Sequence, residues 1–229
     1  KDDFPVMGNN GEPFLNYRKP NVGKTSPIET PAESDEFNDS KLGLQWQWHA
    51  NYQPHWAMPF PSRGVLRMNS VQIPEDYKSL WDVPNLLMQK LPAERFTATV
   101  KVSLEPRFEG ERFGLAVFGL DYYALSVSFK SNKLFLSQEI VKDADKGAKE
   151  TEGDAIELAS KTFHLRVNVE KGAICTFSYS TDGKNFLNIG VPFKAREAKW
   201  IGAKVGLFYT HNGKFNDHGT ADIDWFRIE

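Results

Sequence analysis

The chain has 229 residues, 40% of them hydrophobic, and a formal net charge of -2, which suits one sizeable soluble domain or one domain with a tail. The charge excludes a global basic field for nucleic acid, and no apolar run approaches the roughly 18–20 residues that cross a bilayer. We therefore expect neither nucleic acid nor a membrane as a partner. The chain starts at Lys1 without a signal-peptide hydrophobic region, which indicates a processing or cloning boundary that says nothing about export.

The first segment, residues 1–34, has no lasting hydrophobic period. It contains several glycines and five prolines, namely Pro5, Pro13, Pro20, Pro27 and Pro31. This composition predicts an extended linker that needs another body to lie on.

From about Asp35 onward the pattern indicates one strand after another. Apolar and polar residues alternate over residues 96–104, 123–129 and 163–169. A period of two predicts half-buried strands. The residues expected in the core are Phe96, Val100, Val102, Phe163, Leu165, Val167 and Phe177.

Turn signals separate these strands. Residues 170–172 and 180–184 are expected to join strand pairs, and Asp182-Gly183 is a strong hairpin signal. The short segment 85–91 could be a helix or a strand, and the charged segment 141–154 is expected to be an exposed loop.

The succession of strands predicts an all-β fold, a two-sheet antiparallel β-sandwich over residues 35–229. The single cysteine, Cys175, lies in a strand-like run and is expected to be a buried thiol with no disulfide partner.

Acidic residues could serve two kinds of site. Glycoside hydrolysis needs paired carboxylates, and the nearest candidates are residues 33–36 and the pair Asp222 and Asp224. Neither is a strong candidate, because the first lies at the linker boundary and the second at the chain end. Asp35 and Asp224 could instead hold a structural Ca²⁺ between the first and last strands, although no dense calcium-binding loop is present. The simpler interpretation is that these carboxylates pair with Lys or Arg, and no cofactor is required.

The most unusual stretch is residues 44–61. Leu44, Trp46 and Trp48 would share one face of a strand, and at least one of the tryptophans is expected in the core. A polar and aromatic loop follows, and such side chains suit both the apolar faces and the hydroxyl edges of a sugar. The residues of this candidate site are His49, Asn51, Tyr52, His55 and Trp56.

The same residues carry a resemblance to a known family. The order of motifs resembles the C-terminal module of family 43 glycoside hydrolases, the β-xylosidase and α-arabinofuranosidase group. The matching segments cover nearly the whole chain and are residues 34–37, 42–48, 85–90, 96–98, 114–119, 177–183, 202–207 and 221–226. One departure is Trp48-His49-Ala50-Asn51-Tyr52, where the family commonly has Trp-Asn-His-Asn-Pro, so the contacts of this loop can differ.

The resemblance implies a concanavalin A-like jelly roll that follows a five-bladed β-propeller. The propeller carries the catalytic carboxylates in that family, which implies xylan- or arabinan-derived saccharides as ligands and a secreted or periplasmic location. In some members the module lends an aromatic side chain to the rim of the propeller's pocket. Trp200, preceded by Lys199, occupies the corresponding place here.

Three functions remain open on the sequence. The first is an accessory module that supports and shapes the active site of a parent hydrolase. The second is an autonomous, lectin-like carbohydrate-binding module, and the third is a free-standing sandwich glycanase. The linker-like residues 1–34 favour the first over the second, and the lack of a suitable glutamate pair argues against the third.

Overall fold

The computed structural model describes residues 6–18, 21, 23–27, 29–214 and 217–229. The chain divides into two compact units, Lys1–Pro31 and Ala32–Glu229. In the first unit, β1 (Gly8–Asn9) and β2 (Glu12–Pro13) form a short antiparallel pair, and the Phe14 ring stacks on Tyr17 with centroids 4.9 Å apart. Pro5 and Pro20 of the expected linker lie outside the described residues.

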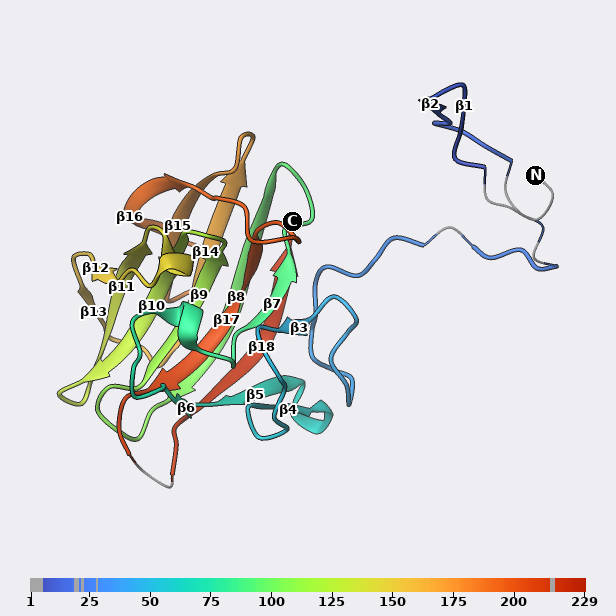
Figure 1. Cartoon of the computed structure of the whole chain (residues 1–229). Coiled ribbons are helices and arrows are strands. Elements are labelled where there is room, and N and C mark those ends of the chain that lie inside the picture. The colour runs from blue at the N-terminus through green and yellow to red at the C-terminus, as the bar shows by residue number, and fades with distance from the viewer. Residues whose placement is uncertain (1–5, 19–20, 22, 28, 215–216) are drawn as a thin grey trace. The chain divides into compact units, whose positions relative to one another are not determined.

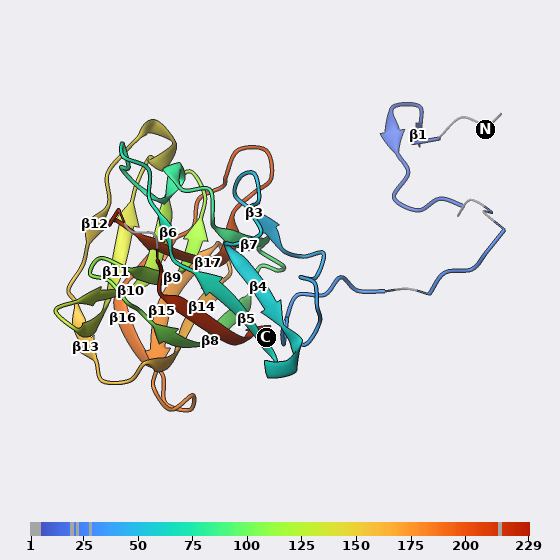
Figure 2. The ribbon, with the colours of Figure 1, turned by 90° about the horizontal axis from the view of Figure 1, so that it is seen from below.

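The second unit is an all-β sandwich of two sheets (Figures 1 and 2). The nine-strand sheet has the order β12-β11-β10-β9-β17-β7-β3, with β13 paired to β11 and β6 to β17. Its strands are β3 (Gln47–Trp48), β6 (Val71–Gln72), β7 (Leu87–Lys90), β9 (Arg112–Phe118), β10 (Tyr122–Lys130), β11 (Lys133–Val141), β12 (Thr151–Glu152), β13 (Ile156–Leu158) and β17 (Lys204–His211).

The seven-strand sheet has the order β16-β15-β14-β8-β18-β5-β4. Its strands are β4 (Ala57–Phe60), β5 (Val65–Asn69), β8 (Phe96–Glu105), β14 (Thr162–Glu170), β15 (Ile174–Ser180), β16 (Leu187–Lys194) and β18 (Thr220–Ile228). Among the described residues the pairings are antiparallel except for β6 with β17. The helical elements of these residues are three 3₁₀ turns, η1 (Pro61–Arg63), η2 (Leu80–Asp82) and η3 (Ala144–Lys146), and no described helix is long and apolar enough to span a membrane.

The core between the sheets contains the residues that the alternation predicts. Phe96 is 5% exposed, and the other six predicted core residues are completely buried, so this prediction is confirmed. The Tyr123 ring of β10 stacks on Phe193 of β16 with centroids 3.9 Å apart, which joins the two sheets directly. Cys175 is also completely buried, and burial raises the pKa of its thiol to about 11.

The outer face of the nine-strand sheet is covered by two segments, residues 73–86 with η2 and residues 142–150 with η3. In Figure 1 both 3₁₀ turns lie in front of the strands. The buried residues of this second core are Leu80, Val83, Leu86, Met88, Ala116, Phe118, Tyr122, Ala124, Val141, Ala144 and Phe208. The expectation of an exposed loop over residues 141–154 is therefore wrong for its first part, where Val141 ends β11 and both Val141 and Ala144 are buried.

The structure also shows the conformation of segment 85–91 and of the two predicted turns. Strand β7 shows that segment 85–91 is a strand, and β14–β15 and β15–β16 are hairpins at the two predicted turns. At the second turn the Asp182 carboxylate accepts hydrogen bonds from the backbone N–H groups of Lys184 and Asn185, both at 2.8 Å.

The strand expected from Leu44 to Trp48 is shorter than predicted. The Trp46 N–H donates to the Gly43 carbonyl at 3.1 Å, so Leu44 lies in a turn and its side chain is fully exposed. Trp46 is 8% exposed and packs edge-on against Phe226. The tryptophan belongs to the core, as expected of at least one of the pair, whereas the shared face with Leu44 does not form.

Candidate functional site

The predicted sugar-facing loop begins with a histidine that is held inside the fold. The His49 N–H donates to the Leu86 carbonyl at 2.9 Å, and its ring lies edge-on to Phe118 at 5.1 Å and to Trp81 at 6.1 Å. Burial lowers the pKa of His49, and the nearby charge of Lys204 lowers this pKa further. The imidazole is therefore neutral near pH 7, and its ring packs against Phe118 and Trp81 inside the fold.

The rest of this loop forms an aromatic stack that is exposed at one end. Tyr52 stacks on Trp48 at 5.6 Å, and Trp48 meets Trp56 edge-on at 5.4 Å. Trp56 is 5% exposed, so the structure corrects its expected role as a sugar-facing ring and places it in the core. Tyr52 remains 51% exposed, with Asn51 and His55 exposed beside it. These three side chains are the part of the loop that a ligand can contact.

Trp200 is the most exposed aromatic residue among those described. Its relative exposure is 100%. Its backbone has φ = +69°, in the left-handed region that residues other than glycine rarely adopt. A non-glycine residue in this region costs on the order of 1–3 kcal/mol, and such strain is concentrated at functional sites. A large apolar ring left in water on a strained turn is consistent with a contact surface for another molecule.

Lys199, from the Trp200 turn, and His49, from the early loop, both contact Trp81. Trp81 was not identified as a candidate residue from the sequence. The Lys199 ammonium lies 5.8 Å from the Trp81 ring centroid and forms an ion pair with Asp145 at 3.6 Å, while His49 contacts the same ring edge-on. Trp81 sits in η2, which begins with a capping box between Ser79 and Asp82. The sequence shows that capping signal, but nothing in it places the turn over the sheet.

The two proposed calcium ligands each bind other groups of the protein. The Asp35 carboxylate accepts hydrogen bonds from the Phe37 N–H at 2.8 Å and from the Trp46 indole N–H at 2.9 Å. Asp224 is paired with Lys101 across the outer face of the seven-strand sheet. No group of three or more His, Cys, Asp or Glu residues that could hold a metal occurs in the described parts of the chain. The donor set at Asp35 and Asp224 therefore does not fit a calcium ion.

The other acidic candidates are also paired with cations. Arg67 donates to both oxygens of Asp222, at 2.6 and 2.8 Å, and Arg63 lies 3.1 Å from the same carboxylate. Arg227 binds Glu36 through two hydrogen bonds, the shorter at 2.7 Å. These pairs match the simpler interpretation of the acidic residues.

Comparisons with known proteins identify the domain. The family model described as "Beta xylosidase C-terminal Concanavalin A-like domain" matches residues 34–229. This chain belongs to that family. The match confirms the resemblance and the concanavalin A-like fold, and it begins close to the boundary between the two units of the structure.

The curated relatives of this concanavalin A-like domain are longer proteins. A Beta-xylosidase of Formosa agariphila is 28% identical over 100% of this chain and 41% of its own length. The non-reducing end alpha-L-arabinofuranosidase BoGH43B of Bacteroides ovatus is 25% identical over 98% of this chain and 42% of its own length. The chain thus spans about two fifths of the length of these relatives.

Solved structures give the same fold. A bifunctional GH43-CE protein of Bacteroides eggerthii matches with a TM-score of 0.79 and 25% identity, over 100% of this chain and 29% of that protein. The GH43 protein BlXynB of Bacillus licheniformis matches with a TM-score of 0.74 and 22% identity, over 95% of this chain and 42% of that protein.

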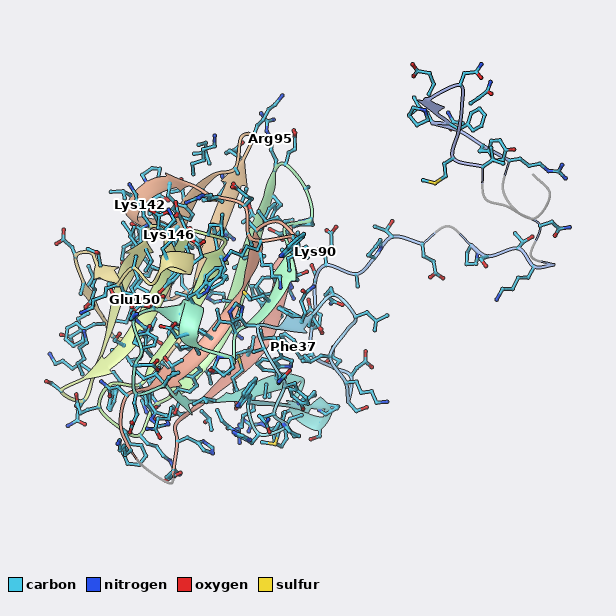
Figure 3. The ribbon with its side chains drawn as sticks, viewed as in Figure 1. Phe37, Lys90, Arg95, Lys142, Lys146 and Glu150 are labelled. Atoms are coloured by element: carbon cyan, nitrogen blue, oxygen red, sulfur yellow. The ribbon has the colours of Figure 1, made fainter. Side chains whose placement is uncertain are left out.

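The concanavalin A-like domain also holds a buried ionic cluster that the sequence did not reveal. The Arg112 guanidinium on β9 donates to Glu139 at 2.8 Å, to Glu150 at 2.9 and 3.1 Å, and to the Tyr77 hydroxyl at 2.6 Å. Figure 3 shows Glu150 in the segment that crosses the front of the nine-strand sheet. Tyr77 and Glu150 belong to the two covering segments, so Arg112 ties both of them to the sheet.

Proposed function

We propose that this domain is the accessory module of a family 43 glycoside hydrolase that acts on xylan- or arabinan-type polysaccharides. In this proposal it follows a five-bladed β-propeller catalytic domain, supports that domain and contributes to the wall of its active site. The observation that carries the proposal is the fully exposed Trp200 on its strained turn. The names and greater lengths of the relatives support the same interpretation.

A tryptophan at a pocket rim would exclude water and orient a sugar ring. Misplacement of a reacting group by about 1 Å can cost on the order of a hundredfold in rate. The ion pair of Lys199 with Asp145 would fix the base of the Trp200 turn, because it ties the preceding residue to a covering segment.

The domain itself would not be catalytic in this proposal. Glycoside hydrolysis needs a positioned acid and a second carboxylate across the scissile bond. The acidic pair suggested by the sequence, Asp222 and Asp224, is committed to Arg67 and Lys101.

A second candidate function is autonomous carbohydrate binding. The half-exposed Tyr52 ring, with Asn51 and His55 beside it, is the observation that favours this alternative. Loops that face a partner domain are not closed pockets, however, and association entropy must still be overcome. We therefore expect only millimolar binding of xylo- or arabino-oligosaccharides at this loop.

The experiment compares hydrolysis of aryl xylosides and aryl arabinofuranosides by this chain, by the full-length parent and by the parent carrying Trp200→Ala. We expect no turnover by the chain and a loss of up to about a hundredfold in the variant. Leu44→Ala in the parent is the control, because Leu44 is an equally exposed apolar residue of the early loop. Turnover by the purified chain would disprove a non-catalytic module, and an unchanged rate in the Trp200 variant would leave a purely supporting role.

A further inference from the structure

One buried lysine of the sandwich has no partner among the described residues. In the described part of the chain, the buried side chains of the Asp, Glu, Lys and Arg types are Glu111, Glu139 and Lys204. Glu111 accepts a hydrogen bond from the Tyr209 hydroxyl at 2.6 Å, and Glu139 binds Arg112. Lys204, the first residue of β17, is 8% exposed and forms no hydrogen bond or ion pair with any described residue. Lysine is almost never buried without a partner, so this position calls for an explanation.

The neighbours of Lys204 in the sheet do not neutralise its charge. Lys204 lies directly opposite Lys90 of β7 on one side and Phe118 of β9 on the other, and residues in such positions share one face of a sheet. Lys90 ends β7 and is exposed (Figure 3). Burial lowers the pKa of Lys204, and the like charge of Lys90 lowers this pKa further. The isolated domain therefore gains nothing from a cation at this position.

The charged end of Lys204 reaches the surface of the domain. Its Nζ is not among the described side-chain nitrogen and oxygen atoms that are sealed from solvent without a hydrogen-bond partner. The small exposed part of the residue thus includes the ammonium group, while the hydrocarbon stem is covered, as is common for long cationic side chains. A group from outside the domain can therefore contact the ammonium directly.

Lys204 belongs to the same surface as the Trp200 turn. It follows Trp200 by four positions, and its charge acts on His49. His49 contacts Trp81 with ring centroids 6.1 Å apart, and the Lys199 ammonium lies 5.8 Å from the centroid of the same ring. These contacts place the exposed tryptophan and the buried lysine on one side of the sandwich.

This surface combines an excess of positive charge with exposed apolar side chains. The ammonium groups of Lys90, Lys199 and Lys204 are matched by one carboxylate in these contacts, that of Asp145, which pairs with Lys199 at 3.6 Å. Beside them, Trp200 is completely exposed and the next residue, Ile201, is 45% exposed. An aromatic anchor among charged residues is typical of a protein interface. The charge excess favours a partner that supplies a carboxylate.

We propose that Lys204 forms an ion pair with an Asp or Glu carboxylate of the domain that precedes this sandwich in the parent protein. The inference rests on the proposed function, which places the Trp200 turn against that domain, and it adds the chemistry of the contact. A protein carboxylate is favoured over a sugar carboxylate because it is present at all times, whereas a buried cation without a permanent partner costs free energy throughout. The curated relatives have room for such a domain, because this chain spans only 41% and 42% of their lengths.

The test compares Lys204→Met in this chain alone and in the full-length parent. In the chain alone the substitution removes an unpaired charge, so the Tm should stay unchanged or rise by up to about 2–4 °C. In the parent it leaves a carboxylate of the partner domain unpaired, so hydrogen exchange at residues 197–203 should accelerate about tenfold or more. A lower Tm in the chain alone, or unchanged exchange in the parent, would overturn the proposal.

Two further variants of the parent show whether the charge at this position is what matters. Lys204→Arg keeps a cation and should retain the slow exchange at residues 197–203. Lys171→Met removes an exposed lysine from the β14–β15 turn and should leave that exchange unchanged. Equal acceleration in the Lys171 and Lys204 methionine variants would mean that total charge, and not an ion pair of Lys204, controls the contact.

A carboxylated sugar is the other possible source of the anion. An NMR titration of this chain, labelled with ¹⁵N, with glucuronic acid and in parallel with neutral glucose examines this source. We expect no saturable shift at residues 199–206 from either sugar. Saturable shifts with glucuronic acid alone would assign the carboxylate to a saccharide and overturn the interdomain pair. These experiments measure contact and not hydrolysis, so a failure of this inference would be distinguishable from a failure of the proposed function in the Trp200→Ala assay.

Discussion

Glu139 shows how burial can offset a favourable ion pair at a single residue. Burial raises the pKa of its carboxyl group to about 7, whereas the positive charge of Arg112 lowers it and the negative charge of Glu150 raises it. The other titratable or charged residues around this cluster are Tyr77, Tyr122, Lys130, Glu152 and His211. Because folded Glu139 binds a proton more tightly than the ordinary carboxyl with a pKa of 4.5, its contribution to stability decreases as the pH rises from about 4.5 to about 7.

We expect Glu139→Gln to flatten the pH dependence of the free energy of unfolding. The amide fills the same space and cannot ionise, so the variant should lose less stability than the parent chain between pH 5 and pH 8. Urea unfolding at several pH values in this range measures the slope. Glu157→Gln, an exposed carboxylate on β13, is the control and should keep the original slope. An equal slope in the Glu139 variant would contradict the raised pKa.

Truncation of an aromatic residue in the core should have a large effect on the free energy of unfolding. Phe177 is completely buried between the sheets and packs against Phe193 at 5.1 Å. Truncation to alanine leaves a cavity, so Phe177→Ala should reduce the free energy of unfolding by about 3–5 kcal/mol. Thr176→Ala changes the adjacent residue on the opposite face of β15 and should stay within about 0.5 kcal/mol. Denaturant unfolding measures both, and equal effects would mean that Phe177 does not pack as described.

At the scale of elements, Tyr122 joins both covering segments to the sheet. Its hydroxyl accepts a hydrogen bond from the Leu80 N–H at 2.8 Å and donates one to Glu150 at 2.5 Å. Tyr122→Phe should cost about 1–3 kcal/mol, because it leaves the buried Leu80 N–H without an acceptor. Hydrogen exchange should accelerate in residues 79–83, as expected of a covering segment that opens more easily.

The neighbouring tyrosine provides the control for this variant. Tyr123 points to the other face of β10, where its ring stacks on Phe193, and its hydroxyl forms no side-chain hydrogen bond with the described residues. Tyr123→Phe should therefore leave both stability and exchange nearly unchanged. If both variants accelerated exchange equally, the Tyr122 hydroxyl would not be what fastens the segment.

The elements also show what sequence patterns can and cannot predict. Alternation located β8 and β14 and their buried residues because one face of each strand meets the core. The covering segments were missed because charged residues there bind each other inside the fold. Arg112 lies 35 positions from Tyr77 and 38 from Glu150, and no local pattern connects partners at such separations. The position of Trp81 beside Lys199 and His49 was not predicted for the same reason. The exposed Trp200 was identified as a candidate only through the family resemblance.

On the scale of the whole molecule, a few hydrogen bonds secure the start of the sandwich. Gln89 donates to the Glu33 carbonyl at 2.9 Å, and the Ile228 N–H donates to the Ser34 hydroxyl at 2.9 Å. Asp35 and Phe226 exchange two backbone hydrogen bonds of 2.8 Å each. Among the described residues, Phe37 is the first that is buried. The physical boundary of the domain thus falls between Pro31 and Glu33, close to the boundary of about residue 34 expected from composition.

Two truncations test where that boundary lies. A chain of residues 32–229 keeps every contact just described, so its free energy of unfolding should equal that of the full chain within about 0.5 kcal/mol. A chain of residues 38–229 loses Phe37, which is 3% exposed and packs against Trp46, and also the Asp35 carboxylate that accepts the Trp46 indole hydrogen bond. This second truncation should lose at least about 3–5 kcal/mol, the cost of removing one buried aromatic side chain. Thermal and urea unfolding of the three chains would decide between the possible boundaries. A large loss in the 32–229 chain would show that residues 1–31 belong to the folded domain, whereas a stable 38–229 chain would show that Phe37 and Asp35 do not secure its first strand.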